Sequence, residues 1–218
     1  MVVYMSVEEL IKLSMGNSLY ERPFEYRFLW SILYPILYVT PRRKRKKIKV
    51  LDIGGAESYL SKVLSGLGFD VTVIDINGYD YGKARFIKAN VLEYEFQREH
   101  FDIILCISTI EHVGLPAYGQ DIIVDNGDRI LAEKIHRWLK KNGLAIITVP
   151  YGKPHHPPSF ERVYTMEKLK ALFPEDKWEW VYTAFACDPM FNGKSWRWCS
   201  ERETRQTDGA CMLLLRKK

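Results

Sequence analysis

A run of small residues directly after an apolar strand carries the clearest chemical signal in the chain. Residues 48–53 predict a buried strand, and Asp52 stands near its end. The run that follows consists of Gly54, Gly55, Ala56, Glu57 and Ser58. Small residues let the backbone approach a ligand closely, and the free N–H groups where a helix begins favour polar or anionic ligand groups. We therefore expect a ligand-binding turn between this strand and the next helix.

An acid ends the second predicted strand, which spans residues 70–74. Asp75 occupies that position, and a carboxylate there can accept hydrogen bonds from both hydroxyls of a ribose. Ligands of open α/β sheets bind at the carboxyl ends of the strands. The turn and the acid together therefore predict a site for a nucleotide-like ligand.

These residues resemble the first motif of class I S-adenosylmethionine-dependent methyltransferases, in which an acid and alternating glycines follow strand one. Asp52, Gly54 and Ala56 match that motif, with Ala56 in place of its second glycine. The resemblance implies S-adenosylmethionine as the cofactor, with Asp75 as the acid that binds its ribose. Asn90 stands where the family usually has an acid on the adenine amino group, and the Asn carbonyl still provides an acceptor there.

The cofactor site implied by this resemblance extends beyond the first motif. Ser58 stands in place of the family's third glycine, which is a mild departure because serine is also small. The residues expected to bind the cofactor are Asp52, Gly54, Gly55, Ala56, Glu57, Ser58, Asp75, Ile76, Asn90, Val91 and Ser108.

Further motifs follow in the family's order. Residues 101–108 resemble its fourth strand, residues 109–114 the turn after that strand, and residues 139–144 the turn before strand five. The resemblance covers about residues 48–218. A nicotinamide dehydrogenase needs the pattern G-x-G-x-x-G, and Tyr59 occupies the place of its third glycine, where it would block close packing of helix on strand. The motifs therefore favour a methyltransferase over a dehydrogenase.

Three residues are candidates for the chemical step, namely Glu111, His112 and His156. Methyl transfer depends mostly on holding the acceptor in line with the methyl group, and an oxygen acceptor of high pKa also needs a general base. Glu111 and His112 end the fourth strand, where a histidine can take a proton near neutral pH. The alternative is that Glu111 caps a turn and His112 packs beneath the next helix.

His155 and His156 lie in the Gly- and Pro-rich loop after strand five. They are either bases near the substrate or an exposed pair in a stiff loop. An adjacent pair without a spaced partner is a weak ligand pattern, so no metal site is expected.

Two other segments are candidates for ligand contact. Tyr20, Arg22, Glu25 and Tyr26 belong to the N-terminal extension, which either closes over the cofactor or serves as a structural cap. Residues 190–202 interleave aromatic side chains with arginines. Such a segment either stacks on a ligand or packs on the sheet.

Short apolar runs alternate with helical stretches from residue 48 onward, which predicts right-handed βαβ units. Two late strands without a long helix between them predict an antiparallel pair. The expected fold is therefore α/β and Rossmann-like, a mostly parallel, doubly wound seven-stranded sheet with an antiparallel edge strand. Residues 1–47 are expected to form an N-terminal helical extension and a basic linker before the methyltransferase domain of residues 48–218.

Charge and cysteine content limit the other function classes. The 218 residues carry a formal net charge of +5, and six cations stand together at positions 42–47, so the remainder is close to neutral. No stretch reaches the ~20 apolar residues of a membrane span, but the aromatic segment 28–39 and the basic run leave a peripheral membrane contact open. A reducing, cytoplasmic location is expected, with Cys106 in the core. The pairing of Cys187, Cys199 and Cys211 stays open.

The resulting hypothesis is methyl transfer to a small-molecule acceptor, with a hydroxyl on a sugar or metabolite as the first expectation. A DNA base methyltransferase is not favoured, because residues 108–111 read Ser-Thr-Ile-Glu where the amino-methylating enzymes carry Asn/Asp-Pro-Pro-aromatic. One alternative is an RNA methyltransferase guided by residues 42–47, since clustered cations bind phosphates. Another is a methyltransferase-like module that binds without catalysis, for which Ala56, Ser58 and Asn90 are the support.

Overall fold

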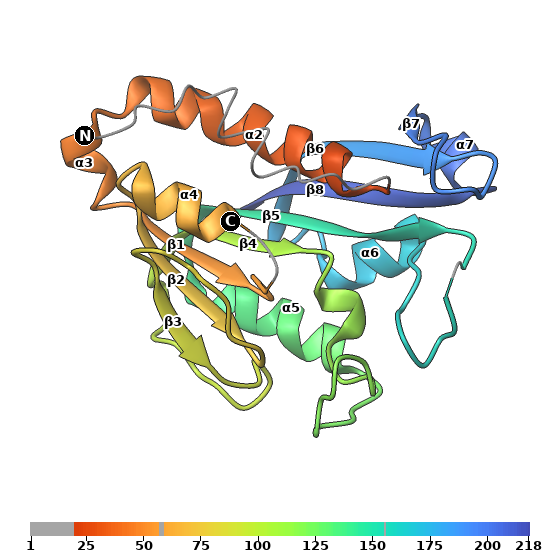
Figure 1. The fold of residues 1–218 in the computed structure, drawn as a ribbon, viewed down its shortest axis with the longest axis horizontal. Helices are drawn as coiled ribbons and strands as arrows, with labels where there is room; N and C mark the ends of the chain where they lie inside the picture. Colours follow the sequence, from red (N-terminus) through yellow and green to blue (C-terminus); the bar gives the residue numbers. More distant parts are fainter. Residues whose placement is uncertain (1–19, 57–58, 155) are drawn as a thin grey trace.

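The structure is a computed structural model that describes residues 20–56, 59–154 and 156–218. In these residues eight strands form one sheet in the order β3-β2-β1-β4-β5-β8-β6-β7 (Figure 1). The strands are β1 (Lys49–Ile53), β2 (Asp70–Asp75), β3 (Arg85–Lys88), β4 (Phe101–Ile107), β5 (Leu139–Gly152), β6 (Trp178–Asp188), β7 (Arg197–Cys199) and β8 (Asp208–Lys217). The first five strands pair with one another in parallel. The expected α/β, Rossmann-like fold is confirmed.

The late strands differ from the prediction in two details. The described sheet has eight strands rather than seven, because the short strand β7 pairs with β6. The antiparallel strand β8 lies between β5 and β6, so that β7 forms the antiparallel edge. A strand of three residues is too short to show an alternating pattern, which is why the sequence did not predict β7.

The central strands are buried on both sides, which explains their continuous apolar sequences. Four of the five residues of β1 and six of the seven of β4 are buried. The parallel register places Asp52 beside Val73 of β2 and Leu105 of β4. The carboxyl ends of these three strands therefore meet at one edge of the sheet, where ligands of such folds bind.

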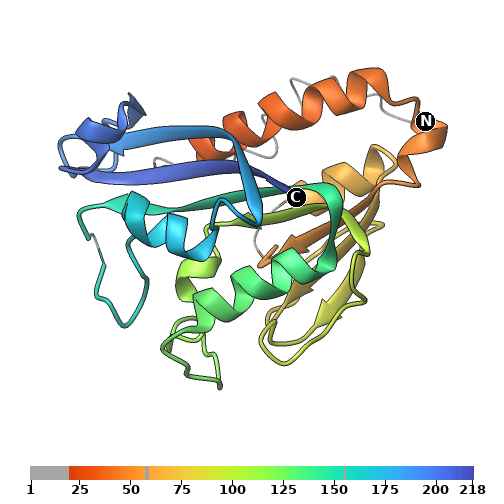
Figure 2. The ribbon, with the colours of Figure 1, turned by 180° about the vertical axis from the view of Figure 1, so that it is seen from behind.

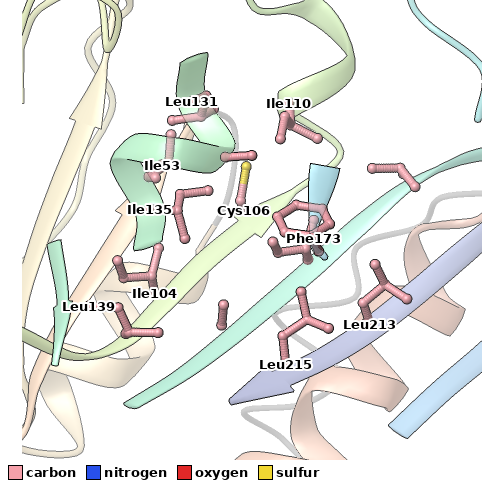
Figure 3. Packing of buried hydrophobic residues seen from close by; sticks show 14 of the residues in the cluster. Ile53, Ile104, Cys106, Ile110, Leu131, Ile135, Leu139, Phe173, Leu213 and Leu215 are labelled. Carbon is pink, nitrogen blue, oxygen red and sulfur yellow. The ribbon is translucent and has the colours of Figure 1, made fainter. Parts of the chain in front are cut away.

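Helices cover both faces of the sheet, so that the fold is doubly wound (Figures 1 and 2). The helices are α2 (Arg22–Val39), α3 (Arg42–Arg45), α4 (Leu60–Gly66), α5 (Gly127–Trp138), α6 (Met166–Leu172) and α7 (Glu201–Thr204), with a 3-10 turn at Ile110–His112. Side chains of α2 and α4 share one apolar cluster, and those of α5 and α6 share the other. Figure 3 shows this second cluster, in which Cys106 is buried among Ile104, Leu131 and Ile135.

Helix α2 is a layer of the fold, because one side of it is buried against the sheet. Leu29, Leu33 and Leu37 recur at the spacing of one helical face, and each is at most 6% exposed. Pro23 lies in the first turn, where a missing N–H costs nothing. Residues Arg22–Val39 of the expected N-terminal extension are thus helical, whereas residues 1–19 of that extension lie outside the described part of the chain.

The basic run does not form a freely solvated linker. Residues Arg42–Arg45 form the short helix α3. Arg45 donates hydrogen bonds to the carbonyls of Leu37, Thr40 and Leu67, and Arg42 donates to that of Gly66. Cations near the last carbonyls of a helix are stabilising. Two of the six cations therefore join the carboxyl ends of α2 and α4 to each other.

The cysteines divide into one pair and two buried thiols. Cys187 and Cys199 form a disulfide that joins β6 to β7, with their Cα atoms 5.9 Å apart. Cys106 and Cys211 are free and buried. Disulfides persist mainly in oxidising compartments, so the cysteines no longer support a reducing location, and a cytoplasmic location stays a prediction. Among the described helices, none is both long and apolar enough to cross a membrane.

Candidate cofactor cleft and active site

The carboxyl edge of the sheet is hollowed into a cleft of about 720 Å³. Binding sites for small molecules usually measure about 300–1,000 Å³. The ends of β1, β2 and β4 form the floor of the cleft, and the amino-terminal residues of α2 form one wall. Nine of the predicted cofactor residues line it: Asp52, Gly54, Gly55, Ala56, Asp75, Ile76, Asn90, Val91 and Ser108. Glu57 and Ser58 lie outside the described residues.

The turn after β1 requires glycine at its first position. Gly54 has φ +73°, which L side chains rarely adopt, and a Cβ built on it would overlap the side chain of Thr109. A Cβ on Gly55 would lie 2.8 Å from Oδ2 of Asp52 and 2.9 Å from Val73. The backbone of this turn is therefore packed tightly against the strand ends and leaves the cleft side open to a ligand.

Replacing Gly54 with alanine is expected to destabilise the protein by about 1–3 kcal/mol, because it combines backbone strain with overpacking. Urea unfolding measures this change. Gly66, whose added Cβ meets nothing within 4 Å, provides the matched control Gly66→Ala. Equal stability of the two variants would contradict the assigned turn geometry.

Asp75 is held ready for a ligand at the end of β2. Its Oδ2 accepts a hydrogen bond of 2.8 Å from the N–H of Ala56, and its Oδ1 accepts one of 2.7 Å from the N–H of Asn77. These bonds fix the carboxylate between the small-residue turn and the loop after β2. Asp75 also lines the cleft, and its role on a ribose diol stays a prediction.

Asp52 is a buried carboxyl beneath the same turn. Its Oδ2 accepts a hydrogen bond of 2.6 Å from the hydroxyl of Ser61. Burial, together with the negative charge of Asp75, raises the pKa of Asp52 to about 6 although the Ser61 hydrogen bond opposes this. The ionised form of Asp52 therefore costs folding free energy and adds negative charge beneath the cleft at neutral pH.

Replacing Asp52 with asparagine is expected to stabilise the ligand-free protein by about 1–3 kcal/mol at neutral pH. The pKa is raised on folding, so the cost of the carboxylate grows as the pH rises from 3.8 to about 6 and is absent at lower pH. Asparagine keeps an oxygen for Ser61 but carries no charge. Urea unfolding at about pH 4 and about pH 8 measures the gain, and a gain of the same size at both values would contradict this explanation.

Asn90 and Ser108 line the cleft, and the side chain of each also forms a hydrogen bond within the protein. The Oδ1 of Asn90 accepts a hydrogen bond of 3.0 Å from the N–H of Leu92. This leaves one lone pair on Oδ1, and the NH₂ group, for an adenine edge. Ser108 has φ +42°, and its hydroxyl donates to Oε1 of Glu25 at 2.5 Å. Ser108 therefore positions α2 as well as facing the cleft.

A buried polar network fixes the start of α2 over the strand ends. Glu25 is fully buried, and its Oε1 accepts hydrogen bonds from the hydroxyls of Ser108 on β4's end and Thr148 on β5. Nη1 of Arg22 lies 3.0 Å from Oε2 of Glu25. Arg22, Tyr20 and the neighbouring Tyr26 line the cleft. The start of α2 therefore forms one wall of the cleft, and closure of the extension over a bound cofactor stays a prediction.

His112 lies on the cleft wall with a fixed tautomer. Its Nδ1 is 2.7 Å from the carbonyl oxygen of Phe160, which only accepts hydrogen bonds, so Nδ1 carries the proton. Burial lowers the pKa of His112 below its ordinary value, against the hydrogen bond to Phe160. The neutral imidazole is therefore favoured, with an unprotonated Nε2.

Glu111 lies behind His112 and does not line the cleft. Its side chain is 1% exposed, and its Oε1 is 3.8 Å from Nε2 of His112. Its Oε2 has no hydrogen-bond partner among the described residues. Burial, together with the charges of Glu25 and Glu161, raises the pKa of Glu111 well above its ordinary value. A catalytic role for Glu111 stays a prediction.

His156, in the loop after β5, does not line the cleft. His156 is exposed, and its ring contacts Phe160 at 5.2 Å between centroids, while Phe160 in turn contacts His112. His155 lies outside the described residues. The ring of Phe160 contacts those of both His112 and His156. A catalytic role for His156 stays a prediction. Within the described residues, no group of three or more potential ligands is arranged to hold a metal ion.

Sequence reasoning missed two cleft residues that follow β4. Tyr118 and Gln120 line the cleft, and the ring of Tyr118 lies 5.0 Å from that of His112. Both sit in the loop before α5, which carries no family motif, and no pattern in the chain marks them. The aromatic segment 190–202 instead packs on α2: Phe24 contacts Trp196 and Trp198. The packing interpretation of that segment is therefore the one the structure supports.

The fold and the cleft define the chain as a class I methyltransferase, a class whose cofactor is S-adenosylmethionine. A family profile described as "Methyltransferase domain" matches residues 32–203, and the chain belongs to that family. Its structure is similar to a SAM-dependent methyltransferase from Archaeoglobus fulgidus, with a TM-score of 0.56, 16% identity and coverage of 87% of this chain and 100% of that one.

Two further proteins are similar to this chain. The N-methyltransferase NodS from Bradyrhizobium japonicum, solved with S-adenosyl-L-homocysteine, has a TM-score of 0.56 and 13% identity over 93% of this chain and 90% of its own. A ubiquinone biosynthesis O-methyltransferase from Rickettsia akari is 28% identical over 116 residues, which are 49% of this chain and 41% of that relative. The match thus spans about two fifths of the curated relative's length.

Proposed function

We propose that this chain transfers a methyl group from S-adenosylmethionine to a hydroxyl oxygen of a small acceptor, with His112 as the general base. The observation that carries the proposal is the tautomer of His112. Its Nδ1 proton is held by Phe160, while the residue lines the same cleft as Asp75 and the small-residue turn. A base within reach of an acceptor oxygen is what O-methylation of a weakly acidic hydroxyl requires.

The residues of the cleft fit S-adenosylmethionine, which carries a sulfonium, an ammonium and a carboxylate. All four of Asp75, Asn90, Val91 and Ile76 line the cleft. Asp75 would bind the ribose hydroxyls, and the other three would contact the adenine. Asp52 lies beneath the turn, where a negative charge suits the cationic centres. Arg22 lines the cleft and suits the carboxylate of the methionine part.

The cofactor supplies an activated methyl group when it is bound. The protein's part is to hold the acceptor oxygen in line with that group and to remove its proton. The unprotonated Nε2 of His112 would accept the proton that the acceptor hydroxyl loses when its oxygen takes the methyl group. The rings of Tyr118 and Phe160 flank this base, and they lie 5.0 Å and 4.9 Å from the His112 ring.

The surroundings of His112 favour a flat aromatic acceptor. Tyr118 and Phe160 contact it edge-to-face, and such surfaces bind aromatic rings well. The relatives of similar sequence are ubiquinone biosynthesis O-methyltransferases, whose name agrees with an oxygen acceptor. We therefore propose a phenolic hydroxyl in preference to the sugar hydroxyl expected from the sequence.

A product assay tests this proposal. The purified protein is incubated with S-adenosylmethionine that carries an isotopically labelled methyl group, together with panels of phenols, catechols and sugars. Labelled O-methyl product and S-adenosylhomocysteine are expected from the phenolic panel. Product from the sugars alone would overturn the acceptor class. Binding of the cofactor without product from any panel would favour the non-catalytic alternative.

A further inference from the structure

The outer face of α2 exposes apolar side chains in a continuous patch near its carboxyl end. Tyr34, Tyr38 and Val39 are 49%, 84% and 73% exposed. Tyr34 and Tyr38 lie four residues apart and so share one side of the helix, and the exposed Val39 borders that side, while Leu33 and Leu37 are buried. Figure 1 shows α2 as the outer layer of the described chain on this face of the sheet.

A group of exposed cations continues directly from this patch. Arg43, Lys44, Lys46 and Lys47 are exposed, and unlike Arg42 and Arg45 they are not engaged with the helix-end carbonyls described above. The chain has no acid between Glu25 and Asp52. Positive charge and exposed apolar surface are therefore concentrated together. We name the surface of Tyr34, Tyr38, Val39, Arg43, Lys44, Lys46 and Lys47 the α2–α3 surface.

We propose that the α2–α3 surface docks the protein peripherally on an anionic lipid bilayer. Tyrosine rings place an apolar body and a polar tip at the level of the headgroups. Basic side chains beside them are attracted to anionic headgroups, and a bilayer needs both contributions for stable peripheral binding. The charge of the surface and the chemistry of its apolar members both complement such a bilayer.

Two observations favour a bilayer over RNA at this surface. Its aromatic and aliphatic members lie exposed on the outer side of a helix, whereas proteins that bind single-stranded nucleic acid hold the bases in a positively charged groove. The basic run also follows the carboxyl end of α2, and the cleft lies at its amino end. The 18 residues of α2 separate the two by about 27 Å. The docking does not depend on the methyl transfer proposed above.

Flotation with lipid vesicles tests the proposal on the full chain. The protein is expected to float with vesicles of phosphatidylcholine and phosphatidylglycerol, and to do so far less with phosphatidylcholine alone. Replacing Lys46 and Lys47 with glutamine is expected to lower the partition coefficient by about 30-fold, and high salt should have a similar effect. Replacing Lys168 and Lys170 on α6 with glutamine removes two exposed cations from the other face and should change little.

The apolar part of the surface has its own test. The double variant Tyr34→Ser and Tyr38→Ser should lose vesicle binding by about tenfold while its thermal unfolding stays close to wild type, because both rings are exposed. Equal flotation of this variant and the wild type would overturn the role of the tyrosines. Binding of single-stranded RNA without binding of anionic vesicles would overturn the proposal and favour the nucleic-acid alternative.

Discussion

Replacing Asp75 with alanine is expected to weaken the binding of S-adenosylmethionine by about 10- to 150-fold. Losing a charge-assisted acceptor costs about 1.5–3 kcal/mol, and Asp75 is fixed toward the cleft by the N–H groups of Ala56 and Asn77. Calorimetric titration measures the change. S-adenosylhomocysteine has the same ribose and should lose a similar factor.

The control for this variant is Asp80→Ala. Asp80 follows Asp75 closely in sequence, but its side chain is 70% exposed and pairs with Lys62 outside the cleft. The affinity of this variant should remain close to that of the wild type. A second variant, Asp75→Asn, keeps one acceptor oxygen for the turn and separates a folding defect from lost binding. Unchanged affinity in a folded Asp75→Ala protein would contradict the assignment of the ribose site.

Replacing His112 with asparagine is expected to lower kcat by about 10²- to 10⁴-fold, which is the usual contribution of a general base. The asparagine amide can still donate to the carbonyl of Phe160 in place of Nδ1, but it has no counterpart of Nε2. The affinity for S-adenosylmethionine should change little, since the cofactor residues remain. Steady-state kinetics with a phenolic acceptor, alongside calorimetric titration, measures both quantities.

The pH dependence of kcat/KM distinguishes a base from a structural residue at this position. Only the neutral imidazole accepts a proton, so the rate should rise with pH through the pKa of His112 and level off above it. Burial lowers that pKa, so the rise should lie on the acid side of the ordinary histidine value. The asparagine variant should lack this rise, whereas His136→Asn on α5 should retain it. A His112→Asn protein that kept the wild-type pH profile of kcat/KM would exclude His112 as the base.

The cofactor half of the site was predictable because it depends on short local patterns. A strand, a turn of small residues and an acid at the next strand end are contiguous in sequence, and parallel pairing brings them together. The residues that line the cleft from farther away left weaker signals. Arg22 lines the cleft from the start of α2 and pairs with Glu25. Glu25 is in turn held by the hydroxyls of Ser108 and Thr148, a network that only the packed α2 creates.

For the candidate catalytic residues after β4, the sequence predicted only a choice between a chemical and a structural role. A histidine after β4 is compatible with a base or with a packed side chain, and only the contact with Phe160, distant in sequence, decides its tautomer. The basic run similarly suggested a free linker. The use of Arg45 on the carbonyls of Leu37 and Leu67 follows from two helix ends meeting, which no local pattern records.

Calorimetric titration of the wild-type protein with S-adenosylmethionine and with S-adenosylhomocysteine tests the central claim most directly. The cleft between Asp75, the small-residue turn and Arg22 predicts one site that binds both ligands with micromolar affinity. Each ligand should also raise the Tm, because a ligand that binds only the folded state stabilises it. A folded protein that gives neither heat nor a shift in Tm with either ligand would contradict the assignment of this cleft.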